Sequence, residues 1–179
     1  KKYLFFIASD VIIKDARELV TCINGLPNSV GVWAPSATGQ RVDHCSNWRT
    51  RYFRDVPYVE GYLFLAKLEV LEPFSPIDLN ENLFGYGIDL LTGYRARRCG
   101  LKCVCDDRVT VHHSSGTGYS SLEASKQMWL WLHKINQQRA LMLLPKSQYQ
   151  NLLNRHGTRI QRFTYPIRFL HKAMRRSKF

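Results

Sequence analysis

Continuous apolar runs, broken by polar residues, predict strands near the start of the chain. The first run, YLFFIA, begins at Tyr3, is typical of a strand buried on both faces, and ends at Ser9 and Asp10. The run VGVWAPSA, residues 30–37, predicts the next strand, and a long polar loop of the kind that binds ligands follows over residues 38–54. Ligands of open α/β sheets bind beyond the carboxyl ends of strands, so Asp10 lies where a ligand is expected.

Helical spacing of apolar residues predicts helices at both ends of the chain. Asp15 is placed to cap a helix that closes at Asn24 and Gly25. A second helical pattern starts at Leu122 and continues to Leu144, where the next residue, a proline, ends it.

The middle of the chain predicts shorter elements. A strand is expected around Tyr58 and Val59, a turn at Glu60 and Gly61, and then a strand or helix over residues 63–71. Two further short strands are expected at residues 101–105 and 109–113. Strands that alternate with helical patterns are typical of an α/β fold.

A carboxylate stands at the start of another predicted helix. In the stretch ENLFGYGIDLLTGYRARRCG, residues 81–100, Asp89 follows Gly85 and Gly87, and the helical pattern runs from there to Gly100. One interpretation makes Asp89 an N-cap with a purely stabilising role. The other gives it a chemical function, and local sequence alone does not decide between them.

Composition and charge narrow the class of protein. The chain has 179 residues, of which 45% are hydrophobic, enough for one globular domain with a core. No apolar run is as long as a membrane-spanning helix. The formal net charge of +12 predicts an anionic partner, which could be nucleic acid, an acidic membrane surface or a phosphorylated small molecule.

The five cysteines form an odd set, which favours a reducing, cytoplasmic location. The run CGLKCVC suggests a zinc site, but that site would need a fourth ligand. Cys103 and Cys105 alternate with Val104 in a predicted strand, where cysteine acts as a small buried apolar residue.

Four polar sites stand at the ends of apolar elements. They are Ser9-Asp10, Glu60-Gly61, residues 85–89, and His113 with the loop from Gly116 to Tyr119. A single carboxylate at a strand end is more often structural than functional, and a histidine next to another histidine is usually a surface residue. The order and separation of the four sites are therefore more informative than any one site alone.

In this order, the sites resemble the C-terminal two-thirds of a nucleotide-sugar glycosyltransferase of the GT-A fold, close to family 2. FFIASDV resembles the strand that ends in a DXD-like motif, VGVWAPSA the strand after it, and YVEGYLFLAKLEVLE the segment that shapes the sugar and acceptor pocket. NLFGYGIDLLTGYRARRCGLKCVCDDRVTVHH resembles the block that holds the catalytic aspartate. The resemblance covers Tyr3 to Gln127, and Glu81 to Tyr119 is its most specific part.

Two features depart from the family pattern. The DXD-like motif, Ser9-Asp10-Val11, has one carboxylate instead of two. The family also places a nucleotide-binding half before this motif. Either that half lies outside the given sequence, or this chain is a remnant of the domain.

The resemblance implies a Rossmann-like GT-A architecture, a mixed sheet flanked by helices, and inverting, metal-dependent sugar transfer. Asp10 and His113 would bind Mn²⁺ or Mg²⁺, whose charge neutralises a leaving diphosphate. Asp89 would be the general base that takes the proton of the acceptor hydroxyl. Donor or acceptor contacts would come from Ser9, Asp10, Glu60, Gly61, Gly87 and Tyr119. The implied partners are a UDP-, GDP- or dTDP-sugar and a glycan or lipid-linked acceptor.

The predicted domain covers residues 1–145, and residues 146–179 form a predicted basic amphipathic helical tail. Its Arg and Lys residues alternate with Phe, Ile and Leu, a pattern that suits peripheral attachment to an anionic membrane. The same tail is compatible with a non-catalytic, anion-binding module that binds RNA, or with a solvated helical surface.

Overall fold

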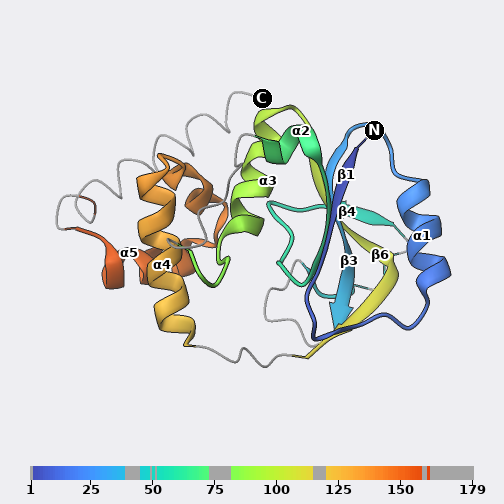
Figure 1. Cartoon of the computed structure of the whole chain (residues 1–179), viewed down its shortest axis with the longest axis horizontal. Coiled ribbons are helices and arrows are strands. Elements are labelled where there is room, and N and C mark those ends of the chain that lie inside the picture. Colours follow the sequence, from blue (N-terminus) through green and yellow to red (C-terminus); the bar gives the residue numbers. More distant parts are fainter. Residues whose placement is uncertain are drawn as a thin grey trace. The chain divides into compact units, whose positions relative to one another are not determined.

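The computed structural model describes residues 2–38, 45–48, 50, 52–72, 82–114, 120–158 and 161. The chain divides into two compact units, Lys1–Leu143 and Leu144–Phe179. The first unit contains the sheet and the helices that flank it (Figure 1). In the described part of the second unit the chain forms α5, Lys146–His156.

Within the described residues, the first unit contains a mixed six-stranded sheet in the order β1-β5-β3-β6-β2, with β4 paired to β6. β3 and β6 run parallel, and the other pairs are antiparallel. The predicted α/β class and the mixed, helix-flanked sheet are therefore confirmed. The strands are β1 (Tyr3–Ile7), β2 (Val11–Ile12), β3 (Val30–Thr38), β4 (Phe53–Asp55), β5 (Leu63–Lys67) and β6 (Lys102–His113).

Helices pack on opposite faces of this sheet (Figure 1). On one face, α1 (Ala16–Asn24) contributes Leu19 and Cys22 to a core shared with Trp33 of β3. On the other, α2 (Leu68–Leu71) and α3 (Ile88–Arg98) contribute Val70 and Ala96 to a second core. α4 (Ser121–Lys134) and a 3₁₀ helix, η3 (Gln138–Leu143), complete the unit.

The first helix forms where the sequence predicts it. The Asp15 side chain accepts hydrogen bonds from the backbone N–H groups of Arg17 and Glu18, at 2.8 and 3.0 Å. These bonds satisfy two donors of the first turn that have no partner within the helix. The predicted cap at Asp15 is confirmed.

The prediction that the first strand is buried on both faces is wrong. β1 lies at the edge of the sheet and pairs with β5. Its residues Leu4, Phe5, Phe6 and Ile7 are each more than two-fifths exposed. An apolar run has the same pattern at an edge as in the middle of a sheet, so periodicity could not distinguish the two positions.

Three other predicted elements need correction. Tyr58 and Val59 are buried but belong to no strand. The two strands expected at 101–105 and 109–113 are one long strand, β6. The helix expected from Leu122 to Leu144 ends at Lys134, because Asn136 adopts the left-handed conformation, with φ of 55°, before η3 begins.

The cysteines fit the expectation drawn from the strand pattern. Cys103 and Cys105 are buried within β6, whereas Cys99 is exposed. Across the described residues, no helix combines the length and the apolar character needed to cross a bilayer.

Candidate functional site

Asp10 and His113 meet at one end of the sheet. β2 pairs with β6 so that Val11 lies opposite His113, which brings the residue before Val11 alongside the end of β6. The Asp10 Oδ2 and His113 Nε2 atoms are 3.1 Å apart, and the Ser114 N–H donates to the Asp10 carbonyl at 3.2 Å. Both side chains remain partly exposed, so this pair is accessible to a ligand.

Asp89 is not a helix cap. The N-cap position of α3 belongs to Gly87, whose φ of 85° is in the left-handed region, and Asp89 lies in the first turn. Its Oδ2 atom accepts from the Gly61 N–H at 3.2 Å and its Oδ1 atom from the Leu90 N–H at 2.7 Å. One of these donors comes from a different segment of the chain, so the carboxylate ties α3 to the loop before β5.

Burial raises the pKa of Asp89 to about 6, although backbone N–H donors, including those of Leu90 and Gly61, act to lower it. The desolvation of the charged form is therefore larger than the stabilisation by these donors. A carboxylate whose pKa lies this close to neutrality can both lose and accept a proton near pH 7.

Steric constraints explain the glycine at position 87 but not the glycine at position 61. A Cβ atom at Gly61 would lie 3.6 Å from Asp89 Oδ2, an ordinary contact distance. At Gly87 a Cβ atom would lie 2.6 Å from Cγ of Met128, so α3 and α4 pack closely there. The position of Gly87 is thus explained by helix packing as well as by its positive φ.

Tyr62 joins the Asp10–His113 pair to the Asp89 region. Its buried ring stacks on the His113 ring with centroids 5.5 Å apart. Its hydroxyl donates to the Pro35 carbonyl, and its backbone carbonyl accepts from the Ala8 N–H at 2.7 Å. Since Tyr62 directly follows Gly61, a continuous set of contacts connects Asp10 and His113 with Asp89.

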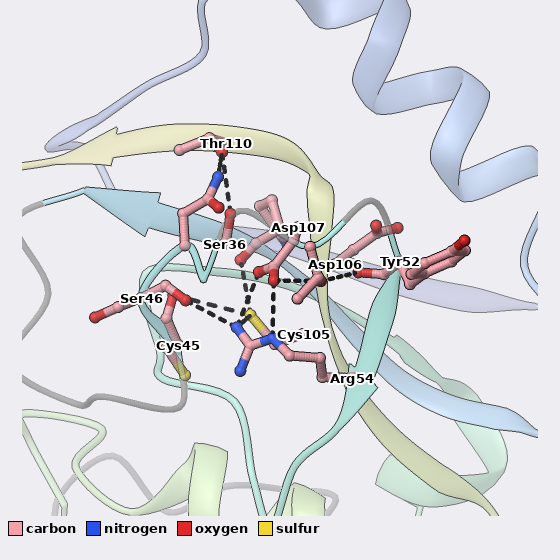
Figure 2. Close-up of polar contacts among 12 residues, drawn as sticks. Ser36, Cys45, Ser46, Tyr52, Arg54, Cys105, Asp106, Asp107 and Thr110 are labelled. Atoms are coloured by element: carbon pink, nitrogen blue, oxygen red, sulfur yellow. Dashed lines mark hydrogen bonds and ion pairs between the residues drawn. The ribbon is translucent and has the colours of Figure 1, made fainter.

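A buried ion pair fixes the neighbouring segment. Arg54 of β4 donates to Asp107 of β6 through Nε and Nη2, both at 2.9 Å, and to the Ser46 carbonyl at 2.8 Å (Figure 2). The Asp107 carboxylate is fully buried. The adjacent Asp106 accepts instead from Arg108 and from the indole N–H of Trp33, and these donors hold the pKa of Asp106 below its usual value despite burial.

Two carboxyl groups, those of Asp89 and Glu60, lie near the buried Tyr58. Burial raises the pKa of Tyr58, and the nearby Asp89, Cys45 and Glu60 raise it further. A hydrogen bond with Cys105 and burial raise the pKa of the Cys45 thiol, although a hydrogen bond from the Glu60 backbone acts to lower it. Cys45, the residue before Ser46, therefore lies next to Glu60.

The structure brings together five of the predicted site residues, namely Asp10, Glu60, Gly61, Asp89 and His113. Ser9 precedes Asp10 and is exposed. Tyr119 lies outside the described residues. In the described part of the chain, no three His, Cys, Asp or Glu side chains are grouped closely enough to hold a metal ion by themselves.

The sequence did not predict two residues of this region, Tyr62 and Arg54. Tyr62 adjoins the predicted Glu60-Gly61 turn, so its position next to a candidate site was a usable signal. Arg54 gave no such signal, because its partner Asp107 is distant in sequence and their meeting depends on the pairing of β4 with β6. Comparison with models of protein families and with curated protein sequences gave no match for this chain.

Proposed function

We propose that this chain carries the transfer site of an inverting nucleotide-sugar glycosyltransferase of the GT-A type. One observation supports the proposal above the others. Asp10, His113, Gly61 and Asp89, which come from four separate segments, are connected through Tyr62 in a single set of contacts. Such convergence is what a site for donor and acceptor requires.

Asp89 is the general base of the proposed reaction. It removes the proton of the acceptor hydroxyl, whose oxygen bonds to the anomeric carbon of the donor sugar. The bond from that carbon to the diphosphate breaks, the electron pair leaves with the diphosphate, and the configuration inverts. The Asp89 Oδ2 atom accepts a hydrogen bond from the Gly61 N–H and Oδ1 accepts one from the Leu90 N–H, and each oxygen has a second lone pair for the hydroxyl.

The residues present fit a hard divalent cation shared with the substrate. Adjacent ligands of an octahedral ion at about 2.1 Å lie about 3 Å from each other. Asp10 Oδ2 and His113 Nε2, 3.1 Å apart, match that separation. When bound there, Mn²⁺ or Mg²⁺ would neutralise charge on the leaving diphosphate, whose oxygens would supply further ligands.

Calorimetric titration with UDP, GDP and dTDP in the presence of Mn²⁺ tests this site. Asp10→Ala and His113→Ala should each weaken binding of the preferred diphosphate on the order of 10-fold or more, since metal and phosphate share the site. His112→Ala is the matched control, because His112 is exposed and bonds to Thr38 rather than to Asp10. Equal affinities in the wild type and in both site variants would contradict the proposal.

A further inference from the structure

Trp48 differs from the other tryptophans of this chain. It is 58% exposed, whereas Trp33, Trp129 and Trp131 are buried. The Arg54 guanidinium lies over its ring, 4.2 Å from the ring centre. A large aromatic ring that is held on a fixed cation but remains in contact with solvent is available to a ligand.

The buried Asp107 fixes the segment that carries this ring. Its carboxylate accepts from Arg54 and from the Thr50 hydroxyl, the latter at 2.6 Å, and its N–H donates to the Tyr52 carbonyl at 3.1 Å. Tyr52 itself is 75% exposed. A fully buried carboxylate is therefore used to hold a surface segment with two exposed aromatic residues, which lowers the entropy lost when that segment binds a ligand.

This segment adjoins the proposed transfer site. Arg54 donates to the carbonyl of Ser46, and the neighbouring Cys45 thiol contacts the Glu60 backbone. Gly61, the next residue, donates to the Asp89 carboxylate. Trp48 is thus connected to the general base by a short series of contacts between ordered residues.

We propose that Trp48, seated on Arg54, is a stacking platform for a pyranose ring of the acceptor glycan. This subsite rests on the proposed function, because it supplies the acceptor side of the same site. The ring face would pack on the indole, and its hydroxyls would point toward the carboxylates of Glu60 and Asp89. Aromatic rings suit this task because they offer a large rigid surface at little entropic cost.

The local charge favours a neutral sugar over an oligonucleotide. Trp48 alone would also stack on a nucleic-acid base, and the chain is strongly basic. However, the Arg54 guanidinium under the ring is paired with the buried Asp107 carboxylate at 2.9 Å, and the nearby carboxyl groups of Glu60 and Asp89 both raise the pKa of Tyr58. Carboxylates accept hydrogen bonds from sugar hydroxyls but repel phosphates.

Fluorine NMR on the full chain, with 5-fluorotryptophan in place of its four tryptophans, tests the platform. The probes are millimolar methyl pyranosides and neutral disaccharides, added without nucleotide, and a short single-stranded RNA. Loss of one signal in Trp48→Phe identifies Trp48. We expect at least one saccharide to shift this signal saturably while the signals of the three buried tryptophans stay in place.

Both Trp48 variants lack the Trp48 signal, so their saccharide affinity is measured by saturation-transfer difference NMR on the saccharide itself. Trp48→Ala should weaken saccharide binding about 10-fold, which corresponds to the loss of one aromatic ring contact, whereas Trp48→Phe should retain most of the affinity. Leu130→Ala is the control, because Leu130 is comparably exposed but lies on α4. No shift of the Trp48 signal with any saccharide, or a shift with RNA alone, would overturn the platform. Saccharide binding at Trp48 in a protein that binds no nucleoside diphosphate would uphold the platform and reject the transferase.

Discussion

At the scale of single residues, the proposed general base, Asp89, has the most direct consequence for the proposed activity. A general base must be ionised, and burial raises the pKa of Asp89 to about 6. We therefore expect kcat/KM for sugar transfer to fall tenfold per pH unit below about pH 6 and to level off above it. A pH–rate profile of the wild type measures this dependence. If the rate fell only below about pH 4, the ordinary pKa of an aspartate, Asp89 would not be the general base.

The same shift predicts how the stability of an Asp89→Asn variant depends on pH. The folded-state pKa is raised, so the wild type gains stability from protonated Asp89 below about pH 4 and loses it as the pH rises through about 6. Relative to the wild type, Asp89→Asn should therefore gain up to about 3 kcal/mol between pH 4 and pH 7. Urea unfolding at several pH values checks this, and a constant difference between the two proteins would refute it.

The sequence predicted which side chains lie at the ends of helices and strands, but not which residues of other strands they contact. Asp10 and His113 could be paired in advance because both follow apolar runs that were expected to end at the same edge. Asp89 was expected at a helix start, yet the cap position went to Gly87, because a glycine with positive φ leads into α3. Tyr62 and Arg54 act through contacts that only the strand pairing creates.

At the scale of elements, the junction of α3 and α4 is sensitive to one methyl group. Gly87→Ala would place a Cβ atom 2.6 Å from Met128 Cγ and would also hold alanine at a φ of 85°. We expect a loss of about 1–3 kcal/mol from the backbone alone, and more from the clash. Met128 is buried, so Met128→Ala is the reference for the double variant. In the Met128→Ala background, Gly87→Ala should cost only the backbone part, because the clash is gone.

Chemical denaturation of the single and double variants measures this effect. Gly100→Ala is a matched control, since Gly100 also has a positive φ, of 70°, but a Cβ atom there would meet nothing within 4 Å. Its loss should match the backbone part alone. Equal losses at the two glycines would show that the α3–α4 contact tolerates the added methyl.

Elements were predictable where the signal is local. The α1 helix carries its own cap, Asp15, and its own stop at Gly25, so its limits follow from neighbouring residues. The positions of β1 and β6 depend on partners far along the chain. An exposed edge strand and one continuous strand with an irregular register both look, in sequence, like ordinary apolar runs.

At the scale of the whole molecule, the positive charge is unevenly divided. Residues 144–179 hold nine Lys and Arg and no Asp or Glu, out of a total net charge of +12. Each basic residue near an anionic membrane contributes about 1 kcal/mol, so removing the second unit should weaken binding to phosphatidylserine vesicles on the order of 10-fold or more. Sedimentation with such vesicles, and with neutral ones as the control, measures the change.

The first unit should remain folded in that shortened chain, because its sheet and both cores lie within Lys1–Leu143. Circular dichroism and thermal unfolding check this. Vesicle binding that survives the deletion would place the membrane contact in the first unit. Salt-dependent RNA binding lost with the tail, without any vesicle binding, would instead favour nucleic acid as the partner of the tail.

The irregular register between β3 and β6 controls which side of the sheet His113 faces. One step along β3, from Pro35 to Ser36, is matched by four steps along β6, from Asp106 to Thr110. The three extra residues reverse the alternation of side chains, so Val104 before the irregularity and Val109 after it reach the same core. Paired residues of neighbouring strands point to the same face, so the pairing of Thr110, Val111 and His112 with Ser36, Ala37 and Thr38 fixes the face of His113 beyond the irregularity. A deletion in β6 that slid this pairing by one residue would turn His113 toward the opposite face, whereas a slide of two residues would keep its face but shift it along the strand.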